Sequence, residues 1–240
     1  MKKLLLKIAG AAAILAVVLV IAAWMALRAS LPQLDGELVV AGIASPVTIQ
    51  RDAEGIPAIT ASNRQDLAYA TGFVHGQDRF FQMDLIRRQA AGEFSALFGA
   101  AAIDADNRNR FHRFRSRAQA VWESTPRAEQ ALMEAYTAGV NAGLDSLDTR
   151  PWEYLVLRIE PQPWRPQDSV LVMYSMYMTL NDERASNEVR RGLAHNVLPE
   201  EVYRWMYQSG TQWDAPIMGE PRSPVPIPGP DVISLRDVRD

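Results

Sequence analysis

The pattern of hydrophobic and polar positions divides the chain into an apolar run, a stretch of alternation and several segments with a helical period. Residues 8–27 contain no charged side chain, and a helix of about 20 residues matches the roughly 30 Å hydrocarbon core of a bilayer. Residues 37–43, 46–51 and 57–61 alternate between polar and apolar positions and are separated by turn-forming residues. We therefore predict a membrane-spanning segment followed by a small antiparallel β meander.

From residue 65 the apolar side chains recur every three or four positions, which predicts a helix with one buried face. Asn63 is a suitable N-cap for this helix. Gly72 and Gly76 weaken it locally, so we expect it to pack closely against a neighbouring element.

Further helical segments extend over residues 126–147 and begin again after residue 168, while the prolines between them exclude regular structure. The fold class is therefore α+β, helix-rich with a small β portion. We divide the chain into a signal anchor or signal peptide (1–30), the main folded region (31–215) and a proline-rich extended tail or linker (216–240).

The N-terminal charges indicate how the chain is placed in the cell. Lys2, Lys3 and Lys7 precede the apolar run, which favours a cytoplasmic N-terminus and export of the remainder to the periplasm. A retained anchor in the cytoplasmic membrane, residues 8–27, is favoured over a cleaved signal peptide, because the run is long and Arg28 interrupts any small-x-small cleavage site. The cleaved signal peptide stays open as the alternative.

The composition excludes several classes of function. The chain has 240 residues and a formal net charge of -3, with all its lysines before the apolar run, so we expect no nucleic-acid partner. It contains no cysteine, which excludes disulfides, thiolate metal sites and a cysteine nucleophile.

The chain's own motifs do not assemble an active site. It contains no Gly-x-Ser-x-Gly, no phosphate loop and no His-Glu-x-x-His, and its three histidines are far apart in the sequence. We assign no catalytic residue. The charged residues Asp84, Arg87 and Arg88 lie three and four positions apart among large apolar side chains, which predicts buried ion pairs in a scaffold helix.

Several blocks of the sequence, in order and covering roughly residues 32–195, resemble the penicillin acylase (penicillin amidase) family. They are PVTIQRD (46–52), GIP (55–57), DLAYATGFVHGQDR (66–79), FQMDLIRR (81–88), AAGEFSALFG (90–99), AYTAGVNA (135–142) and EPQPWRPQD (160–168). So many blocks in register make a chance resemblance improbable. The departures are Gly76, where the family often has alanine, and the absence of the Gly-Ser-Asn-x-Trp junction at which members cleave themselves.

The resemblance implies an N-terminal-nucleophile hydrolase made as a precursor, with this chain as the α-chain part. A β-chain outside this sequence would begin with the catalytic serine, whose own α-amino group acts as base. The two chains would form a four-layer αββα sandwich. The substrate would be a small N-acyl amide of the penicillin or acyl-homoserine lactone type, with no organic cofactor.

The resemblance also implies two kinds of site residue. Glu188 matches the α-chain carboxylate that binds a structural calcium ion, whose other oxygen ligands would come from the β-chain. The alternative is a glutamate that is solvated or paired with Arg190 or Arg191. Met178, Thr179 and Asp182 match the lining of the hydrophobic acyl pocket, although Met178 could equally fill a core.

Two other accounts of the chain remain open. A membrane-anchored periplasmic binding or scaffold protein, complete at residue 240, would expose little apolar surface, whereas an acylase α-chain alone would expose a large one. A family member that folds but has lost hydrolysis would look the same in these residues. The proline-rich tail and the absent junction favour an incomplete precursor.

Overall fold

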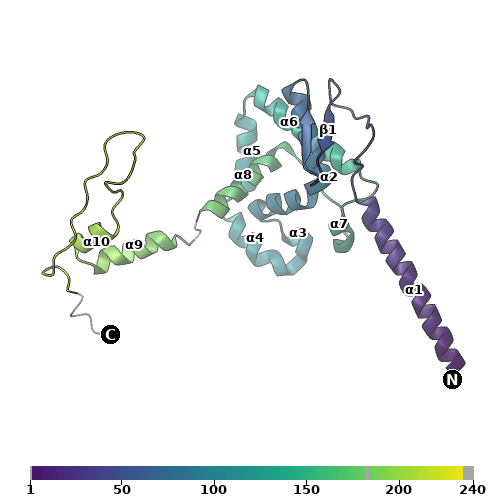
Figure 1. Cartoon of the computed structure of the whole chain (residues 1–240), viewed down its shortest axis with the longest axis horizontal. Helices are drawn as coiled ribbons and strands as arrows, with labels where there is room; N and C mark the ends of the chain where they lie inside the picture. Colours follow the sequence, from purple (N-terminus) through teal and green to yellow (C-terminus); the bar gives the residue numbers. More distant parts are fainter. Residues whose placement is uncertain (1, 182–183, 235–240) are drawn as a thin grey trace. The chain divides into compact units, whose positions relative to one another are not determined.

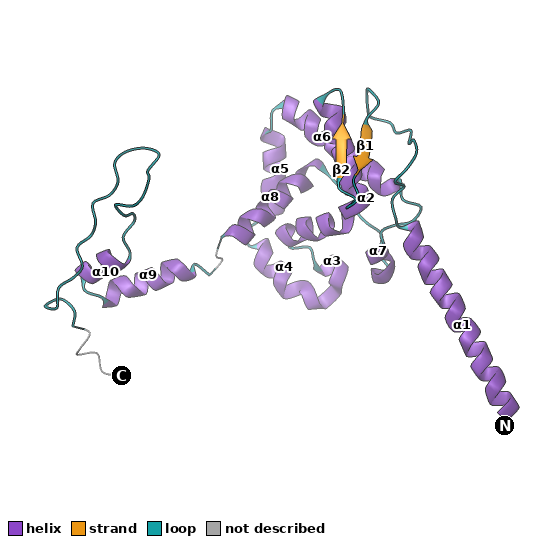
Figure 2. Ribbon diagram, viewed as in Figure 1, coloured by secondary structure: helices purple, strands orange, loops and turns teal. Residues whose placement is uncertain are grey.

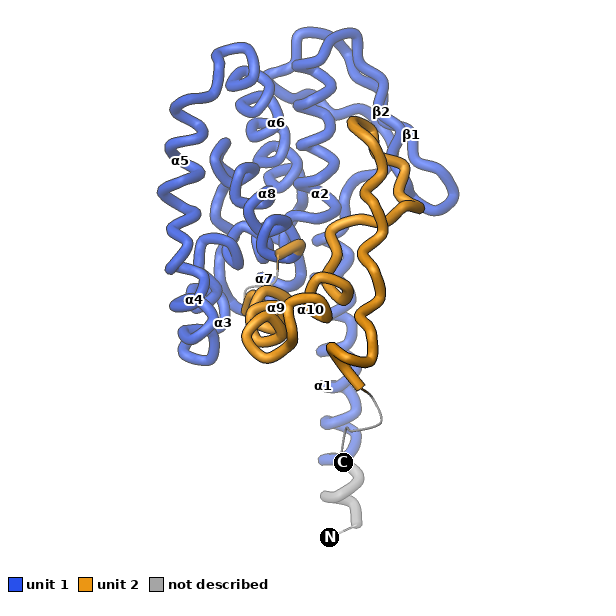
Figure 3. Tube along the Cα trace, turned by 90° about the vertical axis from the view of Figure 1, so that its left-hand side faces the viewer, with its two compact units in different colours: residues 1–179 blue, residues 180–240 orange. Residues whose placement is uncertain are grey.

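The computed structural model describes residues 2–181 and 184–234, and the chain forms two compact units (Figure 3). The first, Met1–Thr179, contains most of the regular structure. In its described residues the second, Leu180–Asp240, contains helices α9 and α10 (Figures 1 and 2). The elements of the first unit are α1 (Lys2–Ala29), β1 (Thr48–Arg51), β2 (Pro57–Thr60), α2 (Arg64–Ala91), α3 (Ser95–Phe98), the 3-10 helix η1 (Gly99–Ala102), α4 (Ile103–Arg110), α5 (Phe114–Ser124), α6 (Arg127–Asp145), α7 (Trp152–Leu157) and α8 (Pro166–Leu180, whose last residue opens the second unit). Those of the second are α9 (Ser186–Val197) and α10 (Glu200–Met206).

Helix α1 contains the predicted apolar run. Residues Lys7–Ala29 have a mean hydropathy of 2.6 and none of their most apolar stretch is buried, so by length and composition this segment is able to cross a membrane. At its C-terminal end the Thr149 amide donates a hydrogen bond of 3.2 Å to the Ala29 carbonyl oxygen.

The β structure is a hairpin and not the predicted meander. β1 and β2 pair antiparallel, with Thr48 opposite Thr60 and Arg51 opposite Pro57. The prediction of a strand at 37–43 is wrong: this part of the described chain has no regular structure. Its alternating pattern finds no partner strand here, Val39 is fully exposed, and Gly42 has a φ of 104° that ends an extended conformation.

The predicted helix from residue 65 is α2, and Asn63 is its N-cap as expected. Asn63 Oδ1 accepts a hydrogen bond of 2.8 Å from the Asp66 amide. The Asp66 carboxylate then reaches out of the helix and accepts from the Ala44 and Ser45 amides at 2.8 and 3.0 Å. The helix ends at Gly92, whose φ of 70° suits a left-handed C-cap.

Four glycines lie where α2 packs against α6. Close packing was predicted for two of them, Gly72 and Gly76. A Cβ atom added at Gly72 or Gly76 would lie 2.1 Å from a carbonyl oxygen of α6. One added at Gly139 or Gly143 of α6 would lie 1.9 or 2.0 Å from a carbonyl oxygen of α2. Each helix therefore presents a Gly-x-x-x-Gly surface to the other, and their backbones approach more closely than any side chain would permit.

Two clusters of buried apolar residues complete the first unit. One joins α2, α5 and α8 through Ala90, Ala91, Phe114, Ala118 and Leu171. The other joins α2, α6, α7 and the segment before α8 through Phe80, Val140, Tyr154 and Trp164. Helix α2 contributes to both clusters, so it is the central element around which the other helices pack.

Candidate functional site

Arg87 is the centre of a buried ion network between α2 and α8. Its Nε donates to Asp84 Oδ1 at 2.7 Å and its Nη1 to Asp168 Oδ2 at 2.6 Å. The same guanidinium donates to the main-chain oxygens of Pro163 and Gln162 at 2.9 and 2.6 Å. One side chain therefore holds the segment 161–165 against α2, and the prolines of that segment prevent it from forming a helix or strand of its own.

Asp84 is the fully buried acceptor of the network. Besides Arg87, it accepts from Arg88 Nε at 2.8 Å and from the Tyr154 hydroxyl of α7 at 2.7 Å. Burial, followed by the neighbouring Asp84 carboxylate, raises the pKa of Tyr154 well above its usual range. The Tyr154 hydroxyl therefore stays protonated and acts as a donor.

The network extends through Asp168 to the surface. Asp168 Oδ1 accepts from Arg115 Nη1 at 2.5 Å, and Arg115 also forms a two-point ion pair with Glu93 at 3.0 and 2.6 Å. Its charged members are Asp84, Glu93 and Asp168 against Arg87, Arg88 and Arg115. These charges balance, which a low-dielectric interior requires.

The sequence found only part of this network. The predicted pairs of Asp84 with Arg87 and Arg88 are confirmed. Arg115, Tyr154 and Asp168 were missed, because they are distant in the sequence. For Asp168 a signal existed: an acid in the first turn of an otherwise apolar helix. The network ties α2, α5, α7 and α8 together, which is a structural role.

The residues predicted for the acyl pocket lie at the C-terminal end of α8. Met178 is half-buried and packs against the cluster of α2, α5 and α8. Thr179 is exposed, and its hydroxyl donates back to the Ser175 carbonyl oxygen at 3.1 Å. Asp182 lies outside the described residues. Met178 therefore has core contacts, while Thr179 faces outward.

Glu188, the predicted calcium ligand, lies in the first turn of α9 in the second unit and is exposed. Arg190 donates to Asn187 Oδ1 at 3.2 Å and Arg191 lies over the ring of Tyr207, so among the described residues neither arginine pairs with Glu188. Within the described part of the chain, no three His, Cys, Asp or Glu side chains converge as a metal site. Since calcium takes six to eight oxygens, Glu188 alone does not form a calcium site, and its role as a ligand stays a prediction.

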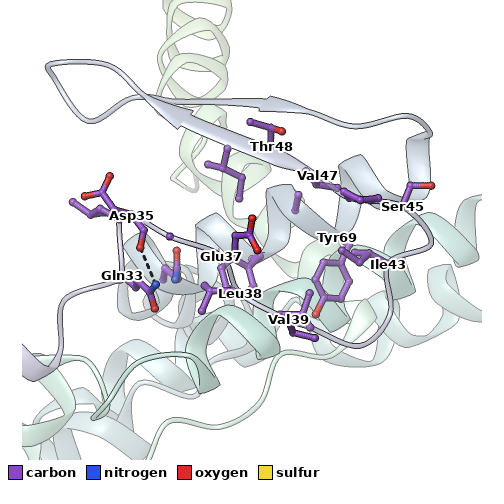
Figure 4. Close-up of a pocket in the computed structure, with 18 of the residues that line it drawn as sticks. Gln33, Asp35, Glu37, Leu38, Val39, Ile43, Ser45, Val47, Thr48 and Tyr69 are labelled. Carbon is purple, nitrogen blue, oxygen red and sulfur yellow. Dashed lines mark hydrogen bonds between the residues drawn. The ribbon is translucent and has the colours of Figure 1, made fainter.

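A hollow of about 750 Å³ lies between the segment before β1 and α2 (Figure 4). Its lining includes the apolar side chains of Leu38, Val39 and Ile43, which lie near Tyr69, and the carboxylates of Asp35 and Glu37. No histidine lines it. The hollow has room for a small molecule.

The histidines do not act together. His75 Nδ1 lies 2.9 Å from the Tyr136 hydroxyl, and burial lowers the pKa of His75 while Asp78 opposes that effect. His112 stacks on Phe114 and His195 meets the edge of Tyr203. Each therefore has a packing role, and none of the described contacts places two of them together.

Comparison with known proteins identifies the class to which this scaffold belongs. The penicillin amidase family profile matches residues 46–219. Penicillin acylase 2 proenzyme of Pseudomonas sp. (strain SE83) is 44% identical over 148 residues, which is 62% of this chain and 19% of that protein. Acyl-homoserine lactone acylase QuiP of Pseudomonas aeruginosa is 32% identical over 162 residues, 65% of this chain and 19% of that protein.

The chain belongs to the penicillin amidase family. It spans about one fifth of the length of the curated relatives that it matches. A thermostable penicillin G acylase from Alcaligenes faecalis shares the fold, with a TM-score of 0.56 at 21% identity, over 74% of this chain and 98% of the solved chain.

Proposed function

We propose that this chain is the α-chain part of an acylase precursor, and that the whole protein hydrolyses the linear amide bond of a small N-acyl substrate. The relatives are named for penicillin and for acyl-homoserine lactones, and either type suits the proposal. The observation that carries it is the outer face of α8, which is apolar yet uncovered.

Helix α8 carries apolar side chains in two separate stripes. One stripe packs inward through Val170, Leu171, Tyr174 and Met178. The other stripe carries Met173, Met176 and Leu180 at the i, i+3, i+7 spacing of one helical face, and these residues are 55–76% exposed. Large apolar side chains exposed together mark a surface that another polypeptide covers, so a further chain packed on this stripe is expected.

The lengths of the relatives support a separate partner chain. The matched region is 19% of a protein whose name includes the word proenzyme. The solved penicillin G acylase chain, by contrast, is covered over 98% of its length, so it is itself about as short as this region. A precursor divided into a short α-chain and a longer β-chain accounts for both lengths.

In the proposed enzyme the β-chain begins with serine. The serine hydroxyl attacks the amide carbonyl carbon and passes its proton to its own α-amino group. The amine then leaves with that proton, and water hydrolyses the acyl ester to release the acid. Oxyanion-hole donors from the β-chain stabilise each tetrahedral intermediate. Within a four-layer αββα sandwich, the hairpin β1–β2 would extend a β-chain sheet and α8 would form part of a helical layer.

The contribution of this chain to the site is to binding and not to the chemical step. Met178, Thr179 and Asp182 would line the acyl pocket, where Met178 is already held in place by its packing against the core. Glu188 would supply one oxygen ligand to a structural calcium ion completed by the β-chain. The apolar α1 would hold the enzyme to the cytoplasmic membrane, with the catalytic part in the periplasm.

The first test is expression of the complete reading frame, followed by mass spectrometry of the N-terminal residue of any large fragment. A fragment that begins with serine, with hydrolysis of N-acyl substrates by the product, is the expected result. A reading frame that stops at residue 240, or a product that remains uncleaved and inert, would support the anchored scaffold instead.

A further inference from the structure

Arg88 is a buried arginine whose hydrogen-bonding capacity is mostly unused. Its side chain is only 9% exposed, and its Nε donates to Asp84 Oδ1 at 2.8 Å. Within the described chain its terminal nitrogens, Nη1 and Nη2, have no partner. Its neighbour Arg87, by contrast, uses all three of its nitrogens.

The terminal nitrogens of Arg88 reach the surface of the chain. Among the described residues, the fully buried side-chain atoms that lack a partner are Thr137 Oγ1 and Arg150 Nε, so those of Arg88 are accessible. Arginine is almost never buried without a partner, since its long stem easily carries the guanidinium into water. Arg88 is instead held at Nε by Asp84, with 9% of its side chain exposed.

The charge of the network decides which acceptor fits this fork. The carboxylates of Asp84, Glu93 and Asp168 already balance the guanidiniums of Arg87, Arg88 and Arg115. A further carboxylate would leave an unbalanced negative charge in a buried site, which is costly. Neutral carbonyl oxygens would satisfy the donors without that cost, as Pro163 and Gln162 do for Arg87.

We propose that Nη1 and Nη2 of Arg88 bind main-chain carbonyl oxygens of the β-chain and so form a polar anchor of the interface between the two chains. This inference rests on the proposed function, which supplies the β-chain. The apolar stripe of α8 does not fix the register in which the two chains pack. The directional hydrogen bonds of Arg88 would fix it. Because the fork is already oriented by Asp84, little side-chain entropy is lost when it binds.

The first measurement is an experimental structure of the complete protein. The expected result is that Arg88 Nη1 and Nη2 lie within hydrogen-bond distance of carbonyl oxygens from residues beyond 240, whether or not the precursor has been cleaved. Contact with water alone, or with a carboxylate, would overturn the inference. This measurement is independent of catalysis, so it separates failure of the inference from failure of the proposed function.

The second measurement is the association of the two chains in the processed protein. Arg88→Lys keeps a charge that can pair with Asp84 from four residues away but removes the fork. We expect it to weaken association about tenfold or more, because hydrogen bonds to a charged donor are lost, while the kcat of the intact heterodimer stays unchanged. Arg79→Lys, an exposed arginine of the same helix, is the matched control. Equal urea midpoints of chain separation for both variants would contradict the proposal.

Discussion

Asp84 shows how much structure one buried carboxylate organises. Arg87 and Arg88 of α2 and Tyr154 of α7 all donate to it. If the acid were removed, two guanidiniums would lose the anion at their shared, fully buried acceptor position. The free-energy cost of leaving buried charges uncompensated exceeds the cost of losing the hydrogen bonds themselves.

Replacement of this acid should therefore be strongly destabilising. We expect Asp84→Asn to lower the free energy of unfolding of the complete protein by about 3–5 kcal/mol, as measured by urea denaturation. Glu134→Gln removes an exposed carboxylate in the middle of α6 and should change it by less than about 0.5 kcal/mol. Similar midpoints for the two variants would show that the network carries little stability.

Two other buried acids should make stability depend on pH. The Ala44 amide is the largest cause that lowers the pKa of Asp66, and it outweighs the effect of burial. Burial would raise the pKa of Asp106, but hydrogen bonds from Ser95 and Phe94 outweigh it and lower that pKa. Both folded-state values lie below the ordinary 3.8.

Since both pKa values are depressed on folding, the unfolded chain binds more protons in acid. Their stabilisation is present above about pH 3.8 and is lost as the pH falls through the folded-state values. The double variant Asp66→Asn/Asp106→Asn should be less stable at pH 7 and should show a shallower fall in urea midpoint between pH 5 and pH 2.5. Parallel curves for the variant and the original protein would refute this assignment.

At the scale of elements, the contact of α2 with α6 depends on the absence of side chains. Gly139→Ala would place a Cβ atom 1.9 Å from the Tyr69 carbonyl oxygen, so the helices must separate. We expect a loss of stability of about 3 kcal/mol or more, as for an overpacked core, seen as a lower thermal midpoint.

A matched alanine substitution in another helix should raise stability instead of lowering it. Gly192 lies within α9, and a Cβ added there meets nothing within 4 Å. Gly192→Ala should therefore stabilise α9 by up to about 1 kcal/mol through helix propensity alone, measured by hydrogen exchange of its amides. Destabilisation by both variants would mean that close approach is not the cause of the first effect.

Periodic elements were predictable from the sequence, and elements that depend on partners were not. Asn63, Gly72 and Gly76 correctly indicated the start of α2 and its close neighbour, because capping and helical period are local properties. Residues 37–43 have a strand pattern but no partner to pair with in the described chain, so local alternation misled. Arg115 donates to Asp168, which lies 53 positions later in the sequence, and the local sequence pattern does not indicate that contact.

The roles of the predicted site residues are neither confirmed nor contradicted by the structure. Met178 and Thr179 lie together at one end of α8, and Glu188 lies on α9. Their assignment came from the family resemblance and stays a prediction, because a pocket or calcium site completed by another chain has no signature in this chain alone.

At the scale of the whole molecule, the apolar α1 is expected to decide where the protein resides. In cell fractionation of the complete protein, we expect it in the membrane pellet after an alkaline carbonate wash, which removes peripheral proteins. A variant that lacks residues 2–29 should move to the supernatant. A complete protein that is released by the wash, with its N-terminus beyond residue 29, would instead establish a cleaved signal peptide.

The exposed apolar stripe on α8 also affects the protein while it is being synthesised. Ribosomes make the N-terminus first, so on the proposed arrangement α8 is complete before the β-chain that covers it. The matched region is about one fifth of a relative's length, and at roughly 5–20 residues per second the remainder takes on the order of a minute. Throughout that interval the stripe is open to any apolar surface nearby. The yield of active protein should then depend on chaperones that hold the emerging chain, and slower translation should favour aggregates over product.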